Sequence, residues 1–436
     1  MWTMRQRLVV SCLVVLALVA AGCGNAKAVV SKGGNTDGVT AHSILVGGIA
    51  SVTGPLPGAF APVFQGVSAY FDMVNAAGGI DGRRIDYPSS DQLDDESDPS
   101  IDVLQARALV QADHVFAVVG VATPSFSGAA YLAENDVPTF GYNVNPQWSD
   151  GPSLFGYDGS FTDFEHPGYE SAFVAEQVHA KRVGIIAYNL SQSRQACQGI
   201  ENTMARFHVP VKFTDFSVTP PASVAGLSAD VERMRTAGVD FVASCLDLAG
   251  NLVLSSSLKA AGMTSATQYW LDGYDESALQ RSAALMDGVY LLVSHVPFES
   301  GISQPSRYPE MALYLKEMHR YFPTEQPSEP SLAGWVSAEM FVTGLRMVGR
   351  DLTRSRLVAA INSLTSFTGG LMAPIDWRLE HTSVGLLDCN VFVRVEGSRF
   401  VPVFGSPPTV FKCLAYPQPS SYKVVVVKPP AAIPGG

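Results

Sequence analysis

One pair of residues in this chain has the spacing of a catalytic centre. Ser256 and Lys259 form a Ser-x-x-Lys pattern, in which a lysine can help to deprotonate a nucleophilic serine. The Ser-Asp-Asn and Lys-Thr-Gly sequences that accompany this pattern in serine enzymes do not occur, and neither does Gly-x-Ser-x-Gly. The pair also falls inside a predicted helix, where this spacing arises by chance. We therefore expect no enzymatic activity, and a serine hydrolase that uses Ser256 is the less favoured alternative.

The histidines and acidic residues do not have the spacing of a metal site. No two of the 8 histidines lie within four residues of each other, so no pair can form a zinc-binding helix face. An acidic cluster follows a predicted strand without the residue order of a calcium loop, and consists of Asp91, Asp94, Asp95, Glu96 and Asp98. Carboxylates at this position bind the free amides of a helix start, so we interpret them as caps. We expect no metal and no other cofactor.

Short apolar runs alternate with amphipathic stretches over most of the chain. Strands are predicted at 44–50, 116–120, 137–142, 182–188, 211–216, 240–245, 268–272 and 288–294. Helices are predicted at 62–75, 100–112, 126–135, 194–207, 224–237, 249–261 and 276–285. Strands that are apolar on both sides require helices on both faces of a parallel sheet. The predicted fold class is therefore α/β, with two doubly wound parallel-sheet lobes.

The rest of the chain adds to these lobes without forming a third. Residues 309–364 are mainly helical and should pack onto a lobe, whereas residues 374–404 are predicted to be β-rich, with a strand at 390–395. We expect five parts: a signal peptide (1–22), a flexible tether (23–42), lobe 1 (43–160 with 299–376), lobe 2 (161–298 with 377–413) and a C-terminal tail (414–436).

The N-terminal segment predicts export. Arg5 and Arg7 precede an apolar run over 8–21 that stops just before Cys23. The run is shorter than the roughly 20 apolar residues of a membrane span. It resembles a bacterial lipobox, with Ala20 where leucine is usual, and this implies cleavage before Cys23 and attachment of lipid to its thiol. An ordinary secretory signal followed by an incidental cysteine is the alternative.

Four cysteines follow Cys23, which is an even number in an exported protein. They allow three pairings, and sequence order favours Cys197 with Cys245 and Cys389 with Cys413. Four buried free thiols remain the alternative.

The composition limits the partners. The chain of 436 residues is 47% hydrophobic and 16% charged, with a formal net charge of −11. Apolar content this high excludes a disordered chain, and the acidic balance argues against nucleic acid as a partner. Neutral and cationic small ligands remain open.

Ligands of open doubly wound sheets bind beyond the carboxyl ends of the strands, and two facing lobes make a cleft between such ends. Loops that follow predicted strands therefore supply the candidate ligand-binding residues. On one lobe these loops contain Ala122, Thr123, Ser125, Tyr142 and Val144, and on the other they contain Asp247, Asp272, Tyr274 and Asp275. Amides and hydroxyls facing carboxylates would suit a zwitterion.

Several motifs resemble the type I periplasmic binding proteins of the leucine/isoleucine/valine class. They are Thr-Gly-Pro at 53–55, Asn-Ala-Ala-Gly-Gly-Ile-Asp-Gly-Arg at 75–83, Asp-Pro at 98–99, Val-Val-Gly at 118–120 and Ala-Pro-Ile-Asp-Trp at 373–377. The likeness covers nearly all of 43–403. It implies two lobes joined by three crossovers, which close like a hinge around a small polar solute and deliver it to an ABC permease.

The resemblance also implies roles for single residues. Phe60 is the nearest match to the family's aromatic residue after Thr-Gly-Pro, and 122–125 matches its carboxylate-binding loop. Pro124 and Val144 stand where the family has hydroxyl residues, so a branched-chain amino acid does not follow as the ligand. The family's ammonium acceptor, usually acidic, falls near Gly273 or Tyr274, so the resemblance implies that Asp247, Asp272 or Asp275 takes its place.

We therefore expect a monomeric solute-binding lipoprotein, anchored by lipid alone to the outer face of the cytoplasmic membrane. Its ligand would be an amino acid or a related small polar compound. A ligand-binding sensor of the envelope is the alternative within the same fold.

Overall fold

The computed structural model describes residues 35–56, 58–160, 169–381, 387–405, 410–415 and 424–425. Cys23, the predicted signal peptide and most of the predicted tether lie outside these residues. From Asn35 onward the chain forms one unit.

The first lobe is built on a parallel sheet with the order β2-β1-β4-β5-β6, in which β3 also pairs with β1. Its strands are β1 (Ser43–Ala50), β2 (Arg84–Asp86), β3 (Gln92–Asp94), β4 (Ala117–Val121), β5 (Thr139–Gly141) and β6 (Leu154–Gly156). β4 is buried along its whole length, which explains why its sequence is apolar without alternation.

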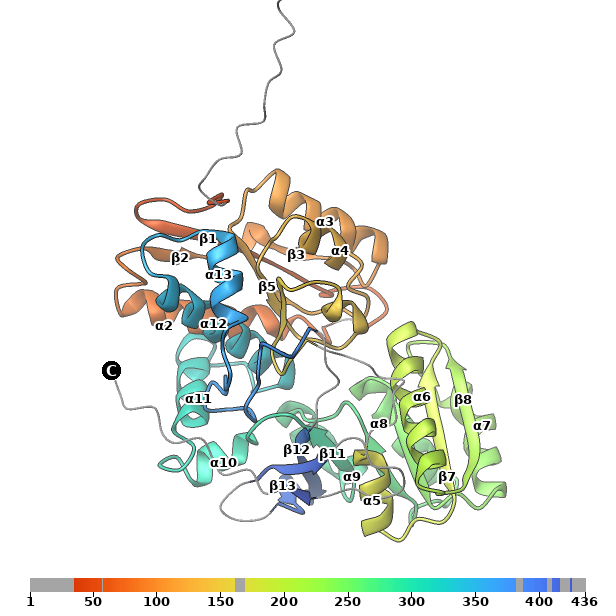
Figure 1. Cartoon of the computed structure of the whole chain (residues 1–436). Helices are drawn as coiled ribbons and strands as arrows, with labels where there is room; N and C mark the ends of the chain where they lie inside the picture. The colour runs from red at the N-terminus through yellow and green to blue at the C-terminus, as the bar shows by residue number, and fades with distance from the viewer. Residues whose placement is uncertain are drawn as a thin grey trace, which may run out of the picture. The chain divides into compact units, whose positions relative to one another are not determined.

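Helices cover both faces of this sheet (Figure 1). On one face lie α2 (Pro62–Ala76), α12 (Glu329–Val348) and α13 (Arg354–Ile361), which share an apolar core with β4 and β5. On the other face lie α3 (Pro99–Gln111) and α4 (Ala129–Glu134). The helical region predicted at 309–364 also contains α11 (Pro309–Tyr321), and it packs onto this lobe as expected.

The second lobe has a sheet with the order β15-β14-β12-β11-β10-β9-β7-β8. Its parallel part consists of β7 (Val183–Tyr188), β8 (Val211–Val218), β9 (Phe241–Cys245), β10 (Thr267–Trp270) and β11 (Tyr290–Val293). The strands β12 (Leu387–Glu396), β13 (Arg399–Val403), β14 (Lys412–Ala415) and β15 (Val424–Val425) extend it in antiparallel pairing. The end of lobe 2 predicted from the sequence, residue 413, falls within β14.

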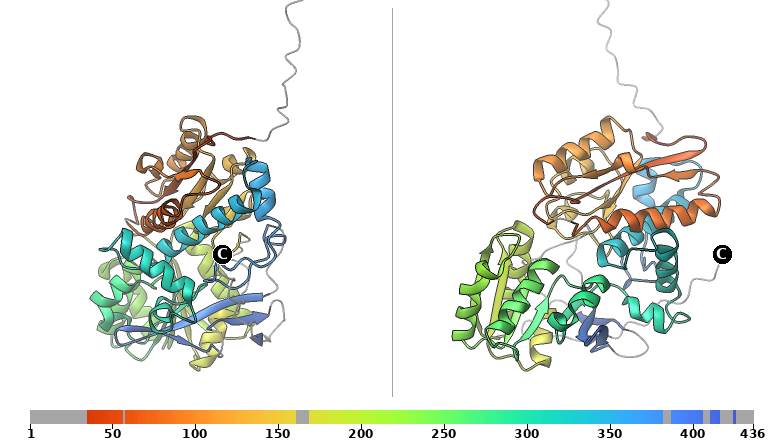
Figure 2. Two further views of the ribbon diagram at one scale, coloured as in Figure 1. Left: turned by 90° about the vertical axis from the view of Figure 1, so that its left-hand side faces the viewer. Right: turned by 180° about the vertical axis from the view of Figure 1, so that it is seen from behind.

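Two helical layers enclose the second sheet as well (Figure 2). α5 (Glu170–Gln177) and α6 (Ser191–Arg206) pack on one face, and α7 (Val224–Thr236) and α8 (Leu248–Ala260) pack on the other. α9 (Glu276–Met286) lies against β10 and β11, and the short α10 (Phe298–Ser303) follows β11. The predicted fold class, α/β with two doubly wound lobes, is therefore confirmed.

The chain passes from one sheet to the other three times: after β6, after β11 and before β12. The three passages let the second half of the chain contribute α12 to the first lobe and β12 to the second. Because each lobe is made of segments far apart in sequence, their mutual position depends on these connections.

Both cysteine pairs favoured by sequence order are joined. The bond between Cys197 and Cys245 ties α6 to the end of β9, and the bond between Cys389 and Cys413 links β12 to β14. The alternative of four free thiols is therefore wrong for this structure.

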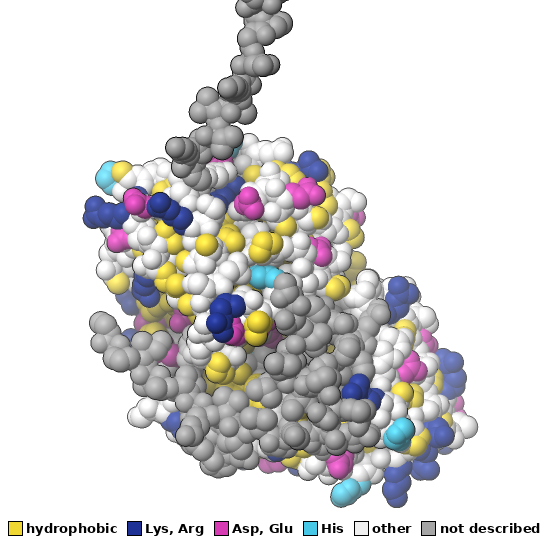
Figure 3. All heavy atoms as spheres, in the orientation of Figure 1, with side chains coloured by type: hydrophobic (Ala, Val, Ile, Leu, Met, Phe, Trp, Pro, Cys, Tyr) yellow, Lys and Arg dark blue, Asp and Glu magenta, His cyan; other side chains and the backbone are white. Residues whose placement is uncertain are grey.

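The surface carries both signs of charge. On the face seen in Figure 3, Lys and Arg side chains occur in separate groups with Asp and Glu side chains between them. Within the described part of the chain, no helix has the length and apolar character needed to cross a membrane.

Candidate ligand-binding site

Polar side chains from both lobes meet where the strands of the two sheets end. Tyr157 follows β6 of the first sheet, and Ser294 follows β11 of the second. The Tyr157 hydroxyl lies 2.7 Å from Ser294 Oγ and donates a hydrogen bond of 3.0 Å to Glu329 Oε1. One hydroxyl therefore connects the ends of both sheets with a carboxylate.

Local capping places Glu329 at this point. Ser328 is the N-cap of α12, where its side chain accepts a hydrogen bond from the amide of Ser331, and Glu329 is the first residue of the helix. The positive end of the helix dipole stabilises a carboxylate in the first turn. The helix start thus holds Glu329 at the edge of the first lobe, within reach of Tyr157.

A row of aromatic rings leads to this carboxylate through Tyr142. The ring centroids of Tyr142 and Tyr157 are 5.4 Å apart, and those of Phe60 and Tyr142 are 6.3 Å apart. Burial, followed by the charge of Glu329, raises the pKa of the Tyr142 hydroxyl well above its usual value. Phe60 and Tyr142, both predicted as ligand-binding residues, are therefore brought together, and Tyr142 lies near Glu329.

The second lobe contributes further carboxylates. Asp247 is the N-cap of α8 and accepts hydrogen bonds from the amide of Gly250 at 3.0 Å and from the hydroxyl of Tyr188 at 2.5 Å. Asp272 follows β10 and accepts a hydrogen bond of 3.1 Å from the amide of Leu248. The two carboxylates thus lie at adjacent strand ends, as their positions in the sequence predict.

These carboxylates hold their protons more tightly than usual. Burial, and then the charge of Asp272, raises the pKa of Glu329 to about 8. Asp272 is exposed to solvent, yet desolvation by the surrounding protein, followed by the charge of Asp247, raises its pKa to about 7. Like charges that face one another without a cation raise the pKa in this way.

The predicted carboxylate-binding loop is engaged inside the first lobe. The Ala122 amide donates to the carbonyl of Ile49, and its carbonyl accepts from the amide of Ser51. Thr123 is 1% exposed, and its hydroxyl lies 3.3 Å from Ser51 Oγ and accepts from the amide of Ser125. The backbone of Ala122 and the hydroxyl of Thr123 therefore already have partners within the protein.

The other predicted residues lie in different surroundings. Ser125 is half-buried, with its Oγ 3.2 Å from Ser127 Oγ, and Val144 is half-buried with its amide bonded to the Tyr142 carbonyl. Tyr274 is 3% exposed, and its hydroxyl donates to Glu299 Oε2 at 2.7 Å. Tyr274 is therefore packed in the interior, away from the surface where a ligand would arrive.

The acidic cluster after the predicted strand is structural, as interpreted from the sequence. Asp94 accepts hydrogen bonds from the amides of Val52 and Thr53, and Asp98 caps α3. This fixes the Thr-Gly-Pro loop, from which Leu56 packs into the apolar cluster of α7 and α8 in the second lobe.

The lysine of the Ser-x-x-Lys pattern bonds to the backbone of a neighbouring helix. Ser256 and Lys259 both lie on α8, and the Lys259 ammonium donates a hydrogen bond to the carbonyl of Ala284. Among the residues that the structure describes, no group of three or more His, Cys, Asp or Glu side chains could hold a metal ion.

The chain matches the family model described as periplasmic binding protein over residues 43–398. It belongs to that family. The match covers the first lobe and the second lobe as far as β12, and it includes every residue of the candidate site. A search of curated proteins gave no match.

Solved structures of the same fold include several solute-binding proteins. A substrate-binding periplasmic protein from Ralstonia solanacearum superimposes with a TM-score of 0.69 at 18% identity, covering 83% of this chain and 100% of its own. A branched-chain amino acid transporter substrate binding protein from Streptococcus pneumoniae, in complex with isoleucine, has a TM-score of 0.66 at 16% identity and coverages of 83% and 99%. An ABC transporter solute-binding protein from R. palustris, in complex with benzoate, has a TM-score of 0.67 at 16% identity and coverages of 83% and 95%.

Three residues of this family member's site were not predicted: Tyr157, Ser294 and Glu329. Tyr157 follows a strand of only three residues that has no detectable period, and Glu329 begins a helix whose partner strands lie far away in sequence. The Ser-Glu-Pro sequence at 328–330, a cap followed by a proline in the first turn, marks the helix start and was the available signal.

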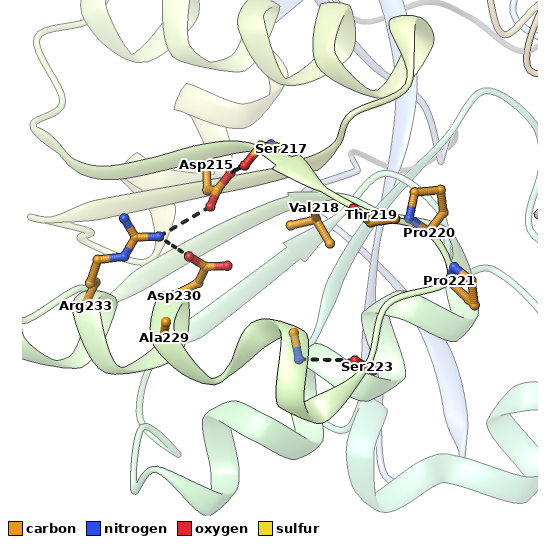
Figure 4. Close-up of a pocket in the computed structure, with 11 residues that line it drawn as sticks. Asp215, Ser217, Val218, Thr219, Pro220, Pro221, Ser223, Ala229, Asp230 and Arg233 are labelled. Atoms are coloured by element: carbon orange, nitrogen blue, oxygen red, sulfur yellow. Dashed lines mark hydrogen bonds and ion pairs between the residues drawn. The ribbon is translucent and has the colours of Figure 1, made fainter.

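A hollow lies on the outer edge of the second lobe, between β8 and α7 (Figure 4). It has a volume of about 640 Å³. The figure shows Arg233 pointing toward Asp215 and Asp230, and it forms ion pairs with both. These charges are satisfied by one another. All the described residues that line the hollow belong to the second lobe, so a ligand there would not bridge the lobes.

Proposed function

We propose that this protein is an extracytoplasmic solute-binding lipoprotein that captures a small polar solute between its two lobes and delivers it to an ABC permease. The observation that carries the proposal is the meeting of Tyr157, Ser294 and Glu329 at strand ends of both lobes. A solute bound beside them would touch both lobes and favour a closed state over an open one. The permease would then recognise the closed surface.

The comparisons support the general class of ligand. Proteins of the same fold have been solved with isoleucine and with benzoate, and another is described as a fatty acid ABC transporter protein. We propose an amino acid or a related small polar compound for this chain. The lobe division proposed from the sequence, 43–160 with 299–376 and 161–298 with 377–413, would place the site between the lobes.

We further propose that lipid on Cys23 anchors the monomer to the outer face of the cytoplasmic membrane. The sequence that ends at Cys23 supports this. Labelling of growing cells with a fatty-acid analogue should mark the wild-type protein and not the Cys23→Ala variant.

A ligand screen tests the central proposal. The mature protein should be heated with amino acids, amides and other small polar solutes, because a solute that binds only the native state raises the melting temperature. A solute that does so should also reduce the radius of gyration measured by small-angle X-ray scattering. If binding occurs without any contraction, capture between closing lobes is wrong.

A further inference from the structure

One apolar side chain of the first lobe is buried against the second lobe. Leu56 lies in the Thr-Gly-Pro loop that follows β1, and it is only 7% exposed. Every other described residue that is buried in its apolar cluster belongs to the second lobe, on or beside β7, β8, β9, α7 and α8. Ala59 and Phe60, which follow shortly after Leu56, pack against the same cluster. This part of the chain therefore makes an apolar contact across the lobes.

The base of the Thr-Gly-Pro loop is fixed to the first lobe. Asp94, on β3 of the first sheet, accepts hydrogen bonds from the amides of Val52 and Thr53 at 3.0 and 3.2 Å, and from the Thr53 hydroxyl at 2.7 Å. Gly54 has a φ of +95°, and a Cβ there would lie 2.0 Å from the carbonyl oxygen of Glu96. Glycine is therefore required for this close approach. Because its base is held in this way, the loop moves with the first lobe.

The contact lies away from the connections between the lobes. Two of the three passages meet the second sheet at β11 and β12, which are neighbours in it. The cluster around Leu56 lies on β7, β8 and β9, and β7 and β8 form the end of the strand order on the far side of β9 and β10. Figure 1 shows β7, β8 and α7 at the side of the second lobe that is remote from β11 and β12. A rotation about the passages would therefore pull Leu56 out of its cluster.

The cross-lobe contact also borders the candidate site. Tyr188 belongs to the cluster around Leu56, and its hydroxyl donates a hydrogen bond of 2.5 Å to Asp247. On the other side, the ring centroid of Phe60 is 6.3 Å from that of Tyr142. Removal of an apolar side chain from water is favourable in proportion to its buried area, whether or not a solute is present. Burial of Leu56 therefore favours closed lobes at the edge of the site.

We propose that the Thr-Gly-Pro loop is a latch: Leu56 packs into the second lobe when the lobes close and stabilises the closed arrangement of the free protein. The proposal goes beyond the proposed solute-binding function, because the latch acts before a solute binds. The same contact must break before a bound solute can leave, so the latch slows release. Since the contact is apolar, it restrains opening without a requirement for charge on the solute.

Distances between two spin labels test the latch without any solute. Gln111→Cys at the end of α3 and Lys212→Cys on β8 introduce label sites at exposed positions of different lobes. Cys23→Ser removes the remaining free thiol of the mature chain, because its four other cysteines are paired. Pulsed electron paramagnetic resonance then gives the populations of closed and open molecules. Leu56→Ala should lower the ratio of closed to open molecules about tenfold or more.

A second variant and matched controls separate closure from general destabilisation. Leu56→Asp would place a charge in the apolar cluster and should leave the closed arrangement unpopulated. Leu104→Ala and Leu104→Asp change a leucine of α3 that is 63% exposed, and they should leave the ratio unchanged. Circular dichroism should show that all four variants are folded. The wild-type ratio should not fall between about 0.05 M and about 1 M salt, because salt screens ion pairs and not apolar contacts.

Each outcome decides the proposal. An unchanged ratio in both folded Leu56 variants, a wild type without a closed population, or a ratio that falls with salt would overturn the latch. Unfolding of both Leu56 variants would also overturn it, because Leu56 would then be needed for folding. None of these results affects the proposed solute-binding function, which the solute screen tests separately. A ratio that shifts as expected, together with no response to any solute of that screen, would support the latch and overturn the proposed function.

Discussion

At the scale of single residues, whether a hydroxyl can bind a ligand depends on whether other groups of the protein already form hydrogen bonds with it. Thr123 lies at a strand end, where a hydroxyl is a reasonable ligand donor, and the sequence predicts it as such. The sequence does not reveal that Ser51 and Asp95, which are far away in the chain, occupy the space behind it. The positions of Phe60, Tyr142 and Asp272 could be predicted because each follows a recognisable strand or motif. The position of Glu329 depends on packing between distant segments, which no local pattern encodes.

Ser51→Ala should destabilise the protein and leave solute affinity unchanged. Ser51 is 0% exposed, and its hydroxyl is a hydrogen-bond partner of the buried Asp95, whose Oδ2 has no hydrogen-bond partner among the described residues. Loss of a partner to a buried polar group costs about 1–3 kcal/mol. Urea unfolding should report this loss, and the exposed Ser100→Ala in α3 should be nearly neutral. A change in affinity without a change in stability would show that Ser51 contacts the solute.

At the scale of elements, the pattern of apolar residues predicts the strands and helices that are long and regular. Each predicted strand overlaps an observed one. Most of them are buried on both faces and are therefore continuously apolar, whereas the edge strand β8 is partly exposed and alternates. The strands β2, β3 and β6 were not predicted, since three residues show no period. The close crossing of α2 and α12 was also not predicted from the sequence, although glycines in both helices permit it.

Gly334→Ala should weaken the first lobe through this crossing. A Cβ at Gly334 would lie 2.1 Å from the carbonyl oxygen of Val63, and a Cβ at Gly66 would lie 1.8 Å from that of Ser331. Backbone atoms cannot move aside as a flexible side chain can, so the helices must separate. Overpacking of this kind costs about 1–3 kcal/mol.

The control variant for this prediction should not reduce stability. Gly226 is an exposed helical glycine of α7, whose added Cβ would meet only the Ser223 hydroxyl at 3.1 Å. Gly226→Ala should therefore be neutral or stabilising by up to about 1 kcal/mol, because alanine has the higher helix propensity. If both variants unfold at the same urea concentration as wild type, the two helices do not pack as tightly as described.

At the scale of the whole molecule, stability without solute should decline on the alkaline side of neutrality. Desolvation by the surrounding protein is the first cause that raises the pKa of six carboxyl groups: to about 7 for Asp102, Glu380 and the solvent-exposed Asp272, and to about 8 for Glu276, Glu329 and Glu339. In the unfolded chain these groups titrate near pH 4. The folded state therefore binds more protons between about pH 4 and pH 8, and the stability that this provides is lost as the pH rises through the folded pKa values.

Two histidines limit stability from the acid side. Burial lowers the pKa of His295 and His381 to about 4, so folding favours their neutral form. Their contribution is present above the unfolded value near 6.5 and is lost as the pH falls toward 4. Because six carboxyl groups act against two histidines, the histidines reduce the fall in stability between about pH 4 and pH 6.5 but do not reverse it.

Urea unfolding between pH 4.5 and pH 9 measures this profile. The midpoint should fall between pH 6 and pH 8.5, because each unit of pKa shift that a buried carboxyl group loses on ionising in the folded state corresponds to about 1.4 kcal/mol. Glu339→Gln should flatten the alkaline decline because it removes one of the groups that must ionise, and Glu325→Gln, whose side chain is exposed, should not. A midpoint that rises steadily from pH 6 to pH 8.5 would show that the carboxyl groups ionise freely in the folded state.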